Sequence, residues 1–326
     1  MNNLKVFGKF LDQPILISKL NKSMPKVMAV GGGLLLANNA IDTFKKTDNK
    51  EQAKKEVLKK GIVMAAAVAS ALVAPKIASK MVNREPIETF ETIASNNQKI
   101  IDEFLAKNNI DVDIASILNK AKNEVLSFSE IKKLAKSLLQ NENGENLFNK
   151  LIPDPQNIKA KDIFSEIGYL STYGAIPVLG GIVGGIGADI IAKEDCKKTI
   201  PDKINEGIYQ YLANIFMCNI GAGAALASLE KANITSKAAR AVGMTSGIIL
   251  TGVLGGSKIA NFVSQKVIAP LTKSTQKERK PEALDVCLHT DDIATVSLLS
   301  GLKWIEPALP ALYSVSGYKA GIGYRN

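Results

Sequence analysis

Runs of apolar residues without any charge alternate along the chain with lysine-rich segments. The runs 167–188 and 207–229 contain 22 and 23 residues. Each is long enough to cross the roughly 30 Å hydrocarbon core of a bilayer as an α-helix, which needs about 20 residues. A third run, 241–257, contains 17 residues and continues as an apolar segment after Lys258, whose long side chain can extend to the membrane surface. These three runs predict membrane-spanning helices.

Three further apolar stretches give a weaker signal. The runs 27–41 and 61–75 contain 15 residues each, a length that fits either a short membrane span or a buried helix. The stretch 293–318 is apolar but contains charged residues and two prolines, so we expect two half-helices or a re-entrant segment there. The pattern therefore predicts between three and six apolar helical elements.

The residues between 85 and 165 have a different pattern. Apolar residues recur there at helical spacing with charged residues between them, as in Ile131, Leu134 and Leu138. Ser127 and Glu130 have the spacing of a capping box, in which each side chain bonds to the backbone N–H of the other residue at the start of a helix. This pattern predicts a small soluble helical domain of roughly 75 residues, near the lower limit for independent folding.

The N-terminal segment is basic and amphipathic. Residues 1–26 contain five lysines and one acidic residue, and apolar residues alternate with the lysines. This pattern suits a segment that lies in a membrane interface, and an ordinary surface helix is the alternative. A cleaved signal peptide is not expected, because the basic region is too long and no small-residue cleavage site follows the first apolar run.

Together these patterns predict an all-α fold, a polytopic helical membrane protein with a small polar helical insert. We expect four segments, which are a basic amphipathic N-terminal segment at 1–26, a short-helix membrane hairpin at 27–84, a small soluble helical domain at 85–165 and a glycine-rich membrane helical bundle at 166–326. The loops on the two sides of such a bundle carry similar numbers of lysine and arginine residues, so the orientation in the membrane does not follow from charge.

Small residues recur at every fourth position inside the apolar runs. Residues four apart share one face of a helix, and a face of small residues allows another helix backbone to approach closely in a membrane. The residues expected to pack helices in this way are Gly180, Gly181, Gly184, Gly185, Gly243, Gly247, Thr251 and Gly255. Ala29, Gly33 and Ala37 repeat the spacing. The alternative is a nucleotide-binding loop, which needs a G-x-G-x-x-G motif after a strand, and the glycine-rich run does not match it.

The aromatic residues are distributed unevenly. All seven tyrosines follow residue 168. Tyrosine and tryptophan favour the two interfaces of a membrane, and pairs of tyrosines open two of the predicted spans. The expected interfacial anchors are Tyr169, Tyr173, Tyr209, Tyr211 and Trp304. Filling of a protein core is the alternative role for these side chains.

The net charge of +10 results from 41 Lys and Arg residues against 31 Asp and Glu residues. The surplus flanks the apolar runs and avoids the polar middle region, as expected for contact with anionic lipid headgroups. The sequence has no arginine-rich run with interleaved aromatic residues, so nucleic acid is not an expected partner. A hydrophobic fraction of 46% excludes a disordered chain, and a count of three cysteines excludes a small disulfide-rich scaffold.

Few residues carry candidate chemistry. Asn214, Asn219 and Lys258 lie in or beside the apolar runs and can contact a solute or a neighbouring helix. Asn214 and Asn219 are five positions apart, about 140° around a helix, so they do not form one site alone. His289 lies near Cys287 and two acidic residues, which are too few ligands for a zinc site. We expect no catalytic residues, no metal and no cofactor.

These features predict a multi-pass protein of the cytoplasmic membrane with a structural or membrane-organising role and no evident catalytic chemistry. The expected partners are the lipid bilayer, with its anionic headgroups, and a second copy of the chain bound through small-residue helix faces. One alternative is a small-solute transporter or channel that uses the glycine-rich bundle, and another is a soluble helical enzyme that uses His289. Charges that converge inside the membrane would favour transport, and the sequence offers only Lys258, Lys303 and Glu306.

Overall fold

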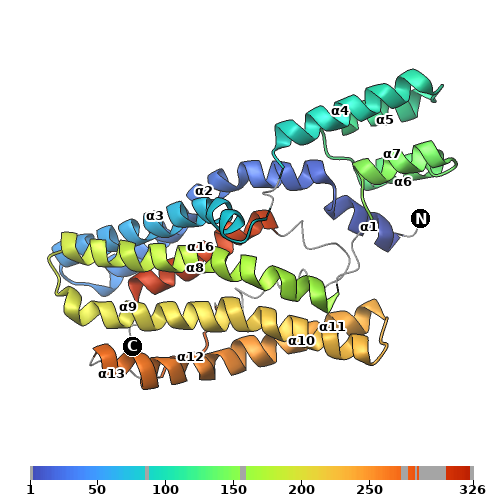
Figure 1. Cartoon of the computed structure of the whole chain (residues 1–326). Helices are drawn as coiled ribbons and strands as arrows, with labels where there is room; N and C mark the ends of the chain where they lie inside the picture. Colours follow the sequence, from blue (N-terminus) through green and yellow to red (C-terminus); the bar gives the residue numbers. More distant parts are fainter. Residues whose placement is uncertain are drawn as a thin grey trace. The chain divides into compact units, whose positions relative to one another are not determined.

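The computed structural model describes residues 3–84, 88–154, 159–272, 278–282, 285 and 306–323. Regular structure in these ranges is entirely helical, as the sequence predicts (Figure 1). Contacts divide the chain into two compact units. The polar unit consists of Met1–Met24, Ile87–Ile158 and Ser297–Ala308, and the bundle unit consists of Pro25–Pro86, Lys159–Val296 and Leu309–Asn326.

The polar unit contains short amphipathic helices around one apolar core. The helices are α1 (Asn3–Leu11), α4 (Phe90–Lys107), α5 (Val112–Ala121), α6 (Phe128–Leu138) and α7 (Glu142–Leu151), with the first turns of α2 (Pro14–Lys46). Side chains that accept hydrogen bonds from N–H groups in the first turns of α4 to α7 are those of Thr89, Asp111, Ser127 and Asn141. The buried core includes Ile101, Leu118, Ile131, Leu134 and Phe148.

The predicted capping box is present at the start of α6. The hydroxyl of Ser127 accepts a hydrogen bond from the N–H of Glu130 at 3.4 Å, and the Glu130 carboxylate accepts one from the N–H of Ser127 at 2.7 Å. Lys120 Nζ donates to the same carboxylate at 2.7 Å. The bond from Lys120, together with the one from the Ser127 backbone, lowers the pKa of Glu130 to about 2. Glu130 therefore holds a negative charge at the N-terminus of α6, where the helix dipole favours it.

Helix α1 packs on this core. The rings of Phe10 and Phe128 stack with their centres 4.7 Å apart. The buried Lys9 donates a hydrogen bond to the carbonyl of Ile152, at the C-terminus of α7, at 2.8 Å. Cations favour this end of a helix, because its last carbonyls have no partner within the helix. One side of the N-terminal segment thus lies in a protein core, where the sequence allowed a membrane interface or an ordinary surface helix.

Five helices of the described chain are long and apolar enough to cross a membrane. They are α2, α3 (Lys50–Met81), α8 (Ala160–Ile191), a continuous helix over Cys196–Lys231 and another over Ala238–Leu271. The fourth consists of α9 (Cys196–Tyr211), a π-helical turn (Leu212–Phe216) and α10 (Met217–Lys231), and the fifth runs from α11 (Lys237–Ile248) through α12 (Ser257–Val263) to α13 (Ala269–Thr272). Each of the five apolar runs before residue 260 lies in one of these helices.

Among the described residues, the stretch near the C-terminus forms a 3-10 turn at Glu306–Ala308 and one short α-helix. Helix α16 (Leu309–Ile322) has 14 residues and is about 21 Å long, which is too short to cross the bilayer core. It packs against α3, α8 and α9 (Figure 1). A half-helix is one of the forms expected for 293–318, and residues 293–305 of that stretch lie outside the described residues.

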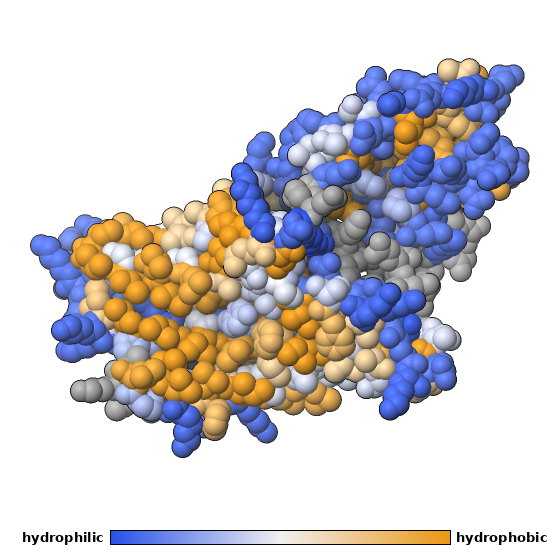
Figure 2. All heavy atoms as spheres, viewed as in Figure 1, coloured by the Kyte–Doolittle hydropathy of each residue, from blue (hydrophilic) through white to orange (hydrophobic). Residues whose placement is uncertain are grey.

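The outer surface of the bundle unit is largely apolar. In Figure 2, hydrophobic side chains gather over the long helices, and hydrophilic side chains lie at the two ends of these helices. Large apolar side chains that are exposed include Leu34, Leu72, Val183, Ile190, Val242, Leu250 and Phe262. Contiguous apolar surface of this kind marks contact with a membrane or a partner. Combined with the length of the five helices, it indicates a membrane protein.

Candidate functional site: a buried charged cluster in the bundle

Four polar residues line one face of the helix that begins with α9. Lys203, Glu206, Gln210 and Asn214 are spaced by three, four and four positions, which places them on the same side over about 16 Å. All four are buried, with relative exposures of 2%, 2%, 0% and 6%. Asn214 lies in the π-helical turn between α9 and α10, and such turns are frequent at functional sites. The side chains of this polar face form one side of the candidate site.

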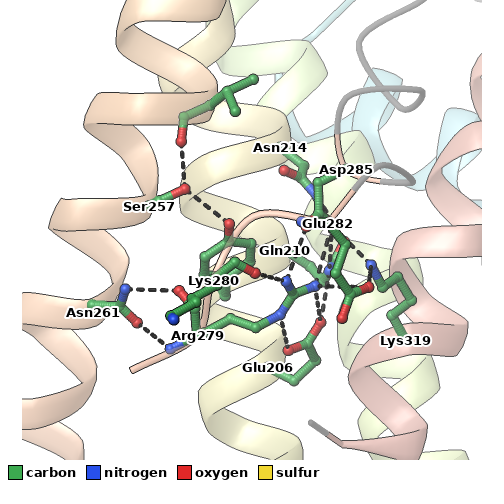
Figure 3. Close-up of polar contacts among 12 residues, drawn as sticks. Glu206, Gln210, Asn214, Ser257, Asn261, Arg279, Lys280, Glu282, Asp285 and Lys319 are labelled. Atoms are coloured by element: carbon green, nitrogen blue, oxygen red, sulfur yellow. Dashed lines mark hydrogen bonds and ion pairs between the residues drawn. The ribbon is translucent and has the colours of Figure 1, made fainter. Parts of the chain in front are cut away.

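Glu206 pairs with Arg279, and Arg279 connects it to further charged residues, including Lys319 of α16 (Figure 3). Arg279 Nε lies 2.9 Å from Glu206 Oε2, and Arg279 Nη2 lies 3.2 Å from Glu206 Oε1. Arg279 Nη1 lies 3.0 Å from Asp285 Oδ2, and Lys319 Nζ of α16 lies 2.8 Å from Asp285 Oδ1. Glu282 approaches Lys319 at 3.0 Å from a more exposed position. These charges alternate in sign.

Two neutral amides complete the network. Gln210 Nε2 donates to Glu206 Oε1 at 2.7 Å, and Asn214 Nδ2 donates to Gln210 Oε1 at 2.9 Å. Asn214 Nδ2 also lies 3.2 Å from Asp285 Oδ1. We refer to Glu206, Gln210, Asn214, Arg279, Glu282, Asp285 and Lys319 as the Glu206 cluster.

The side chains of Asn261 and Tyr209 hold Arg279 in place. The amide of Asn261 on α12 donates to the carbonyl of Arg279 at 2.9 Å and accepts from its N–H at 3.0 Å. The guanidinium lies 4.4 Å from the ring centre of Tyr209, whose hydroxyl bonds to Ser257 at 2.8 Å. Burial alone would lower the pKa of Arg279, but its bonds to Glu206 and the nearby Asp285 raise it. Arg279 is therefore a permanent cation in the bundle.

Asp285 is the matching anion. Burial alone would raise its pKa, but the hydrogen bonds from Lys319 and from the backbone N–H of Glu282 lower it. A carboxylate that accepts several hydrogen bonds from cations and N–H groups stays ionised. The charges of Arg279 and Asp285 thus stabilise each other inside the protein.

A second set of charges surrounds Lys203, which lies about one turn before Glu206 on α9. Asp189, near the end of α8, is fully buried, and its carboxylate lies 2.9 Å from Lys59 Nζ and 2.6 Å from Lys203 Nζ. Lys59 also pairs with Glu194 at 2.5 Å. We refer to Lys59, Asp189, Glu194 and Lys203 as the Asp189 cluster. A small pocket, partly open to solvent, borders it and is also lined by Glu56 and Lys60.

The arrangement holds opposite charges in fixed pairs. In the described part of the chain, no group of His, Cys, Asp and Glu side chains could hold a metal ion. Cys287 and His289, which the sequence offers to an enzyme, lie outside the described residues. Removing one member of a buried pair is costly, because it leaves the other charge without a partner. The clusters can therefore hold the helices of the bundle together. They can move a proton or an ion only if the ion pairs exchange partners.

Of the three polar residues proposed from the sequence, the structure brings one into this site. Asn214 belongs to the Glu206 cluster, whereas Asn219 donates to the carbonyl of Ile215 in its own helix at 2.7 Å. Lys258 is exposed on α12. Glu206, Arg279, Asp285 and Lys319 were not singled out from the sequence.

The eight small residues proposed to pack helices lie in different surroundings. On α8, Gly180 and Gly184 face Ser70 and Ala66 of α3, while Gly181 and Gly185 face the backbones of Gly317 and Gly321 of α16. On the last long helix, Gly247 lies against Gly221 and Ala225, Thr251 against Gly221, and Gly243 against Leu229. A Cβ at Gly255 would be near only the carbonyl of Leu250 in its own helix. Gly317 and Gly321, which are not among these eight residues, also have four-residue spacing.

The proposed anchors lie mostly inside the bundle. Tyr169, Tyr173 and Tyr209 are buried, and the rings of Tyr173 and Tyr313 meet edge to face at 5.3 Å. This is the core-filling arrangement that the sequence left as an alternative. Tyr211 is half-buried, and Trp304 lies outside the described residues.

No family model, curated protein or solved structure matches the chain. The class of protein is therefore given by the fold itself, which is all-helical in the described residues and includes five helices long and apolar enough to span a membrane.

The glycine contacts give a first testable expectation. Replacing Gly185 by Leu should destabilise the bundle by about 1–3 kcal/mol, because a Cβ there would overlap the carbonyl of Gly321. Gly187→Leu is the matched control, since no atom lies within 4 Å of its added Cβ and the gain in helix propensity is the same. The measurement is the thermal unfolding midpoint of the full chain in detergent. Equal midpoints for the two variants would contradict the assigned α8–α16 contact.

The ion pairs give a second expectation. Arg279→Met should lower the free energy of unfolding by about 3 kcal/mol, because Glu206 and Asp285 lose their shared partner. Adding Glu206→Gln to this variant should recover part of the loss, since one of the two unpaired charges is removed. Lys258→Met, at an exposed position, serves as the control. A double variant that is less stable than Arg279→Met would show that the two residues are not paired.

Proposed function

We propose that the protein is an integral, multi-pass protein of the cytoplasmic membrane with a structural or membrane-organising role and no catalytic chemistry of its own. The observation that carries this proposal is the exposed apolar surface of the five long helices, together with the pairing of charged groups inside the bundle (Figures 2 and 3). A helical bundle with apolar side chains on its outer surface and paired charges in its interior is the arrangement favoured in a lipid bilayer.

Close backbone contact supports the same proposal. Hydrocarbon does not drive apolar helices together, so membrane helices associate through tight packing of small residues. The facing pairs Gly181 with Gly317 and Gly185 with Gly321 allow such packing between α8 and α16. In water the same glycines would weaken each helix by about 1 kcal/mol relative to alanine.

Lysines at one end of the bundle support contact with anionic headgroups. Lys45 and Lys46 at the turn between α2 and α3 are exposed, as are Lys193 and Lys197 at the turn between α8 and α9. A basic residue near an anionic membrane surface contributes about 1 kcal/mol to binding. The polar unit, a helical domain with its own core, is the part that we propose to meet protein partners.

The proposal predicts that the protein stays in the membrane pellet after alkaline extraction, because the helices are surrounded by lipid. Release of the protein into the supernatant would refute membrane integration. With five spans, Cys196 and a cysteine introduced by Ser116→Cys in the polar unit should react with an impermeant thiol reagent from opposite faces. The buried Cys218 is the internal control and should react only after denaturation. Labelling of both sites from one face would contradict the five-span topology.

A second candidate function is the transport of protons or small ions through the bundle. The Glu206 cluster favours it, because charged groups inside a membrane bundle often mark the path of an ion, and the sequence alone offered no such convergence. Transport would require Glu206 and Asp285 to exchange partners during each cycle.

This candidate predicts a flux that depends on Glu206. Vesicles that contain the protein and a trapped pH-sensitive dye should dissipate a pH gradient faster than empty vesicles, and Glu206→Gln should abolish the difference. Lys258→Met should leave the rate unchanged, because its side chain is outside the cluster. A parallel assay with K⁺ and Cl⁻ gradients measures transport of these two ions. Rates equal to those of empty vesicles in all assays would eliminate transport of protons and of these ions.

A further inference from the structure

Helix α2 is the least enclosed of the five long helices. In its most apolar 18-residue window only 11% of the residues are buried, against 22% to 50% in the other four. Its contacts with the bundle are few. The amide of Asn39 donates a hydrogen bond to the hydroxyl of Tyr318 at 3.1 Å, and Gly32 lies beside Met64. Most of the circumference of α2 is therefore open.

The glycines of α2 differ from those of the bundle core. Gly181, Gly185 and Gly247 are occupied by contacts within the chain. Gly31 and Gly33, in the middle of the apolar run 27–41, have no atom within 4 Å of an added Cβ. These two glycines are two positions apart and so lie on opposite sides of α2, and at each of them the helix surface is still free to accept another helix.

A regular seam of residues runs along the open side of α2. Val27, Gly31, Leu34, Asn38 and Ile41 are separated by four, three, four and three positions, which is the spacing of the contact positions in a two-stranded coiled coil. The three large apolar members, Val27, Leu34 and Ile41, are 54%, 67% and 53% exposed. We refer to these five residues as the α2 seam.

Asn38 is the residue that identifies the partner. Its side chain is exposed, and none of the described residues hydrogen-bonds to it. Asn38 lies about 6 Å along the helix from the middle of the run, so in a bilayer its amide would face hydrocarbon, where an unmet polar group is costly. An amide both donates and accepts, so a second amide at the same depth would satisfy it.

We propose that the protein forms a parallel homodimer through the α2 seam, with Asn38 of one chain hydrogen-bonded to Asn38 of the other. Two copies inserted with the same topology have parallel α2 helices, and a two-fold axis along the membrane normal places equal residues opposite each other. Gly31 gives the close approach, and Leu34 and Ile41 pack across the axis. A single asparagine at such a position fixes the register and the number of strands. This inference rests on the proposed membrane function.

The test measures association of the full chain in lipid vesicles. Copies that carry a donor or an acceptor fluorophore on an added C-terminal tag are mixed at decreasing protein-to-lipid ratios. Asn38→Leu should weaken dimerisation by about tenfold, because one interhelical hydrogen-bonded pair is lost. Leucine suits a membrane helix, so insertion is retained. Gly31→Leu should also weaken the dimer. Ala37→Leu is the matched control, because Ala37 is exposed on the same helix but lies outside the α2 seam.

The outcomes separate this inference from the proposed function. Energy transfer that falls for Asn38→Leu and Gly31→Leu but not for Ala37→Leu supports the seam. Absence of energy transfer in the unmodified protein at every ratio would mean that lipid alone covers α2, and equal effects of Asn38→Leu and Ala37→Leu would also overturn the proposal. If the protein is monomeric yet resists alkaline extraction, only the dimer is refuted, whereas release by alkali refutes both.

Discussion

The backbone contact between α8 and α16 determines where Lys319, one of the charged groups of the bundle, lies. Gly181 and Gly185 on one helix face Gly317 and Gly321 on the other, so the two backbones approach each other closely. Helix α16 is short, and this contact sets its position along α8. Lys319 lies between the two glycines of α16 in the sequence and reaches Asp285. A larger side chain on either glycine face would shift α16 and separate this ion pair.

The buried charges impose a second constraint, because each needs a partner of opposite sign. Asp285 receives bonds from Arg279, from Lys319 of α16 and from Asn214 of the helix that begins with α9. Asn261 on α12 binds the backbone of Arg279. Arg279 and Asp285 are thus bonded to three helices, and the irregular backbone of residues 278–282 is of a kind tolerated near a membrane interior only when protein surrounds it.

Features that depend on residues close in sequence could be predicted. The apolar runs gave the long helices, and the spacing of Ser127 and Glu130 gave the start of α6, because both depend on neighbours within a few positions. The residues with four-residue spacing on α8 lie beside α3 and α16, whereas a Cβ added at Gly255, on the last long helix, would be near only its own helix, and their role in packing stays a prediction.

The Glu206 cluster could not be predicted in full, because its members come together only in the tertiary structure. Glu206 and Arg279 are 73 positions apart, and Arg279 lies in a segment without apolar periodicity. The uncharged run 207–229 begins directly after Glu206, so in the sequence this residue resembles a charge that flanks a membrane span. One usable signal was present, namely the spacing of Lys203, Glu206, Gln210 and Asn214 on one helical face. It shows that a polar face continues from the flanking segment into the apolar run.

The charge balance of the Glu206 cluster bears on the choice between a fixed bundle and a transport path. Its most buried charged members are two anions, Glu206 and Asp285, and two cations, Arg279 and Lys319, so their charges cancel, while the carboxylate of Glu282 is about half exposed to water. A balanced set has little net charge with which to attract an ion. Opening one buried pair costs several kcal/mol, which makes the open state at least about a hundredfold less populated than the closed one. The resting geometry therefore favours a fixed, membrane-embedded framework over a transport path.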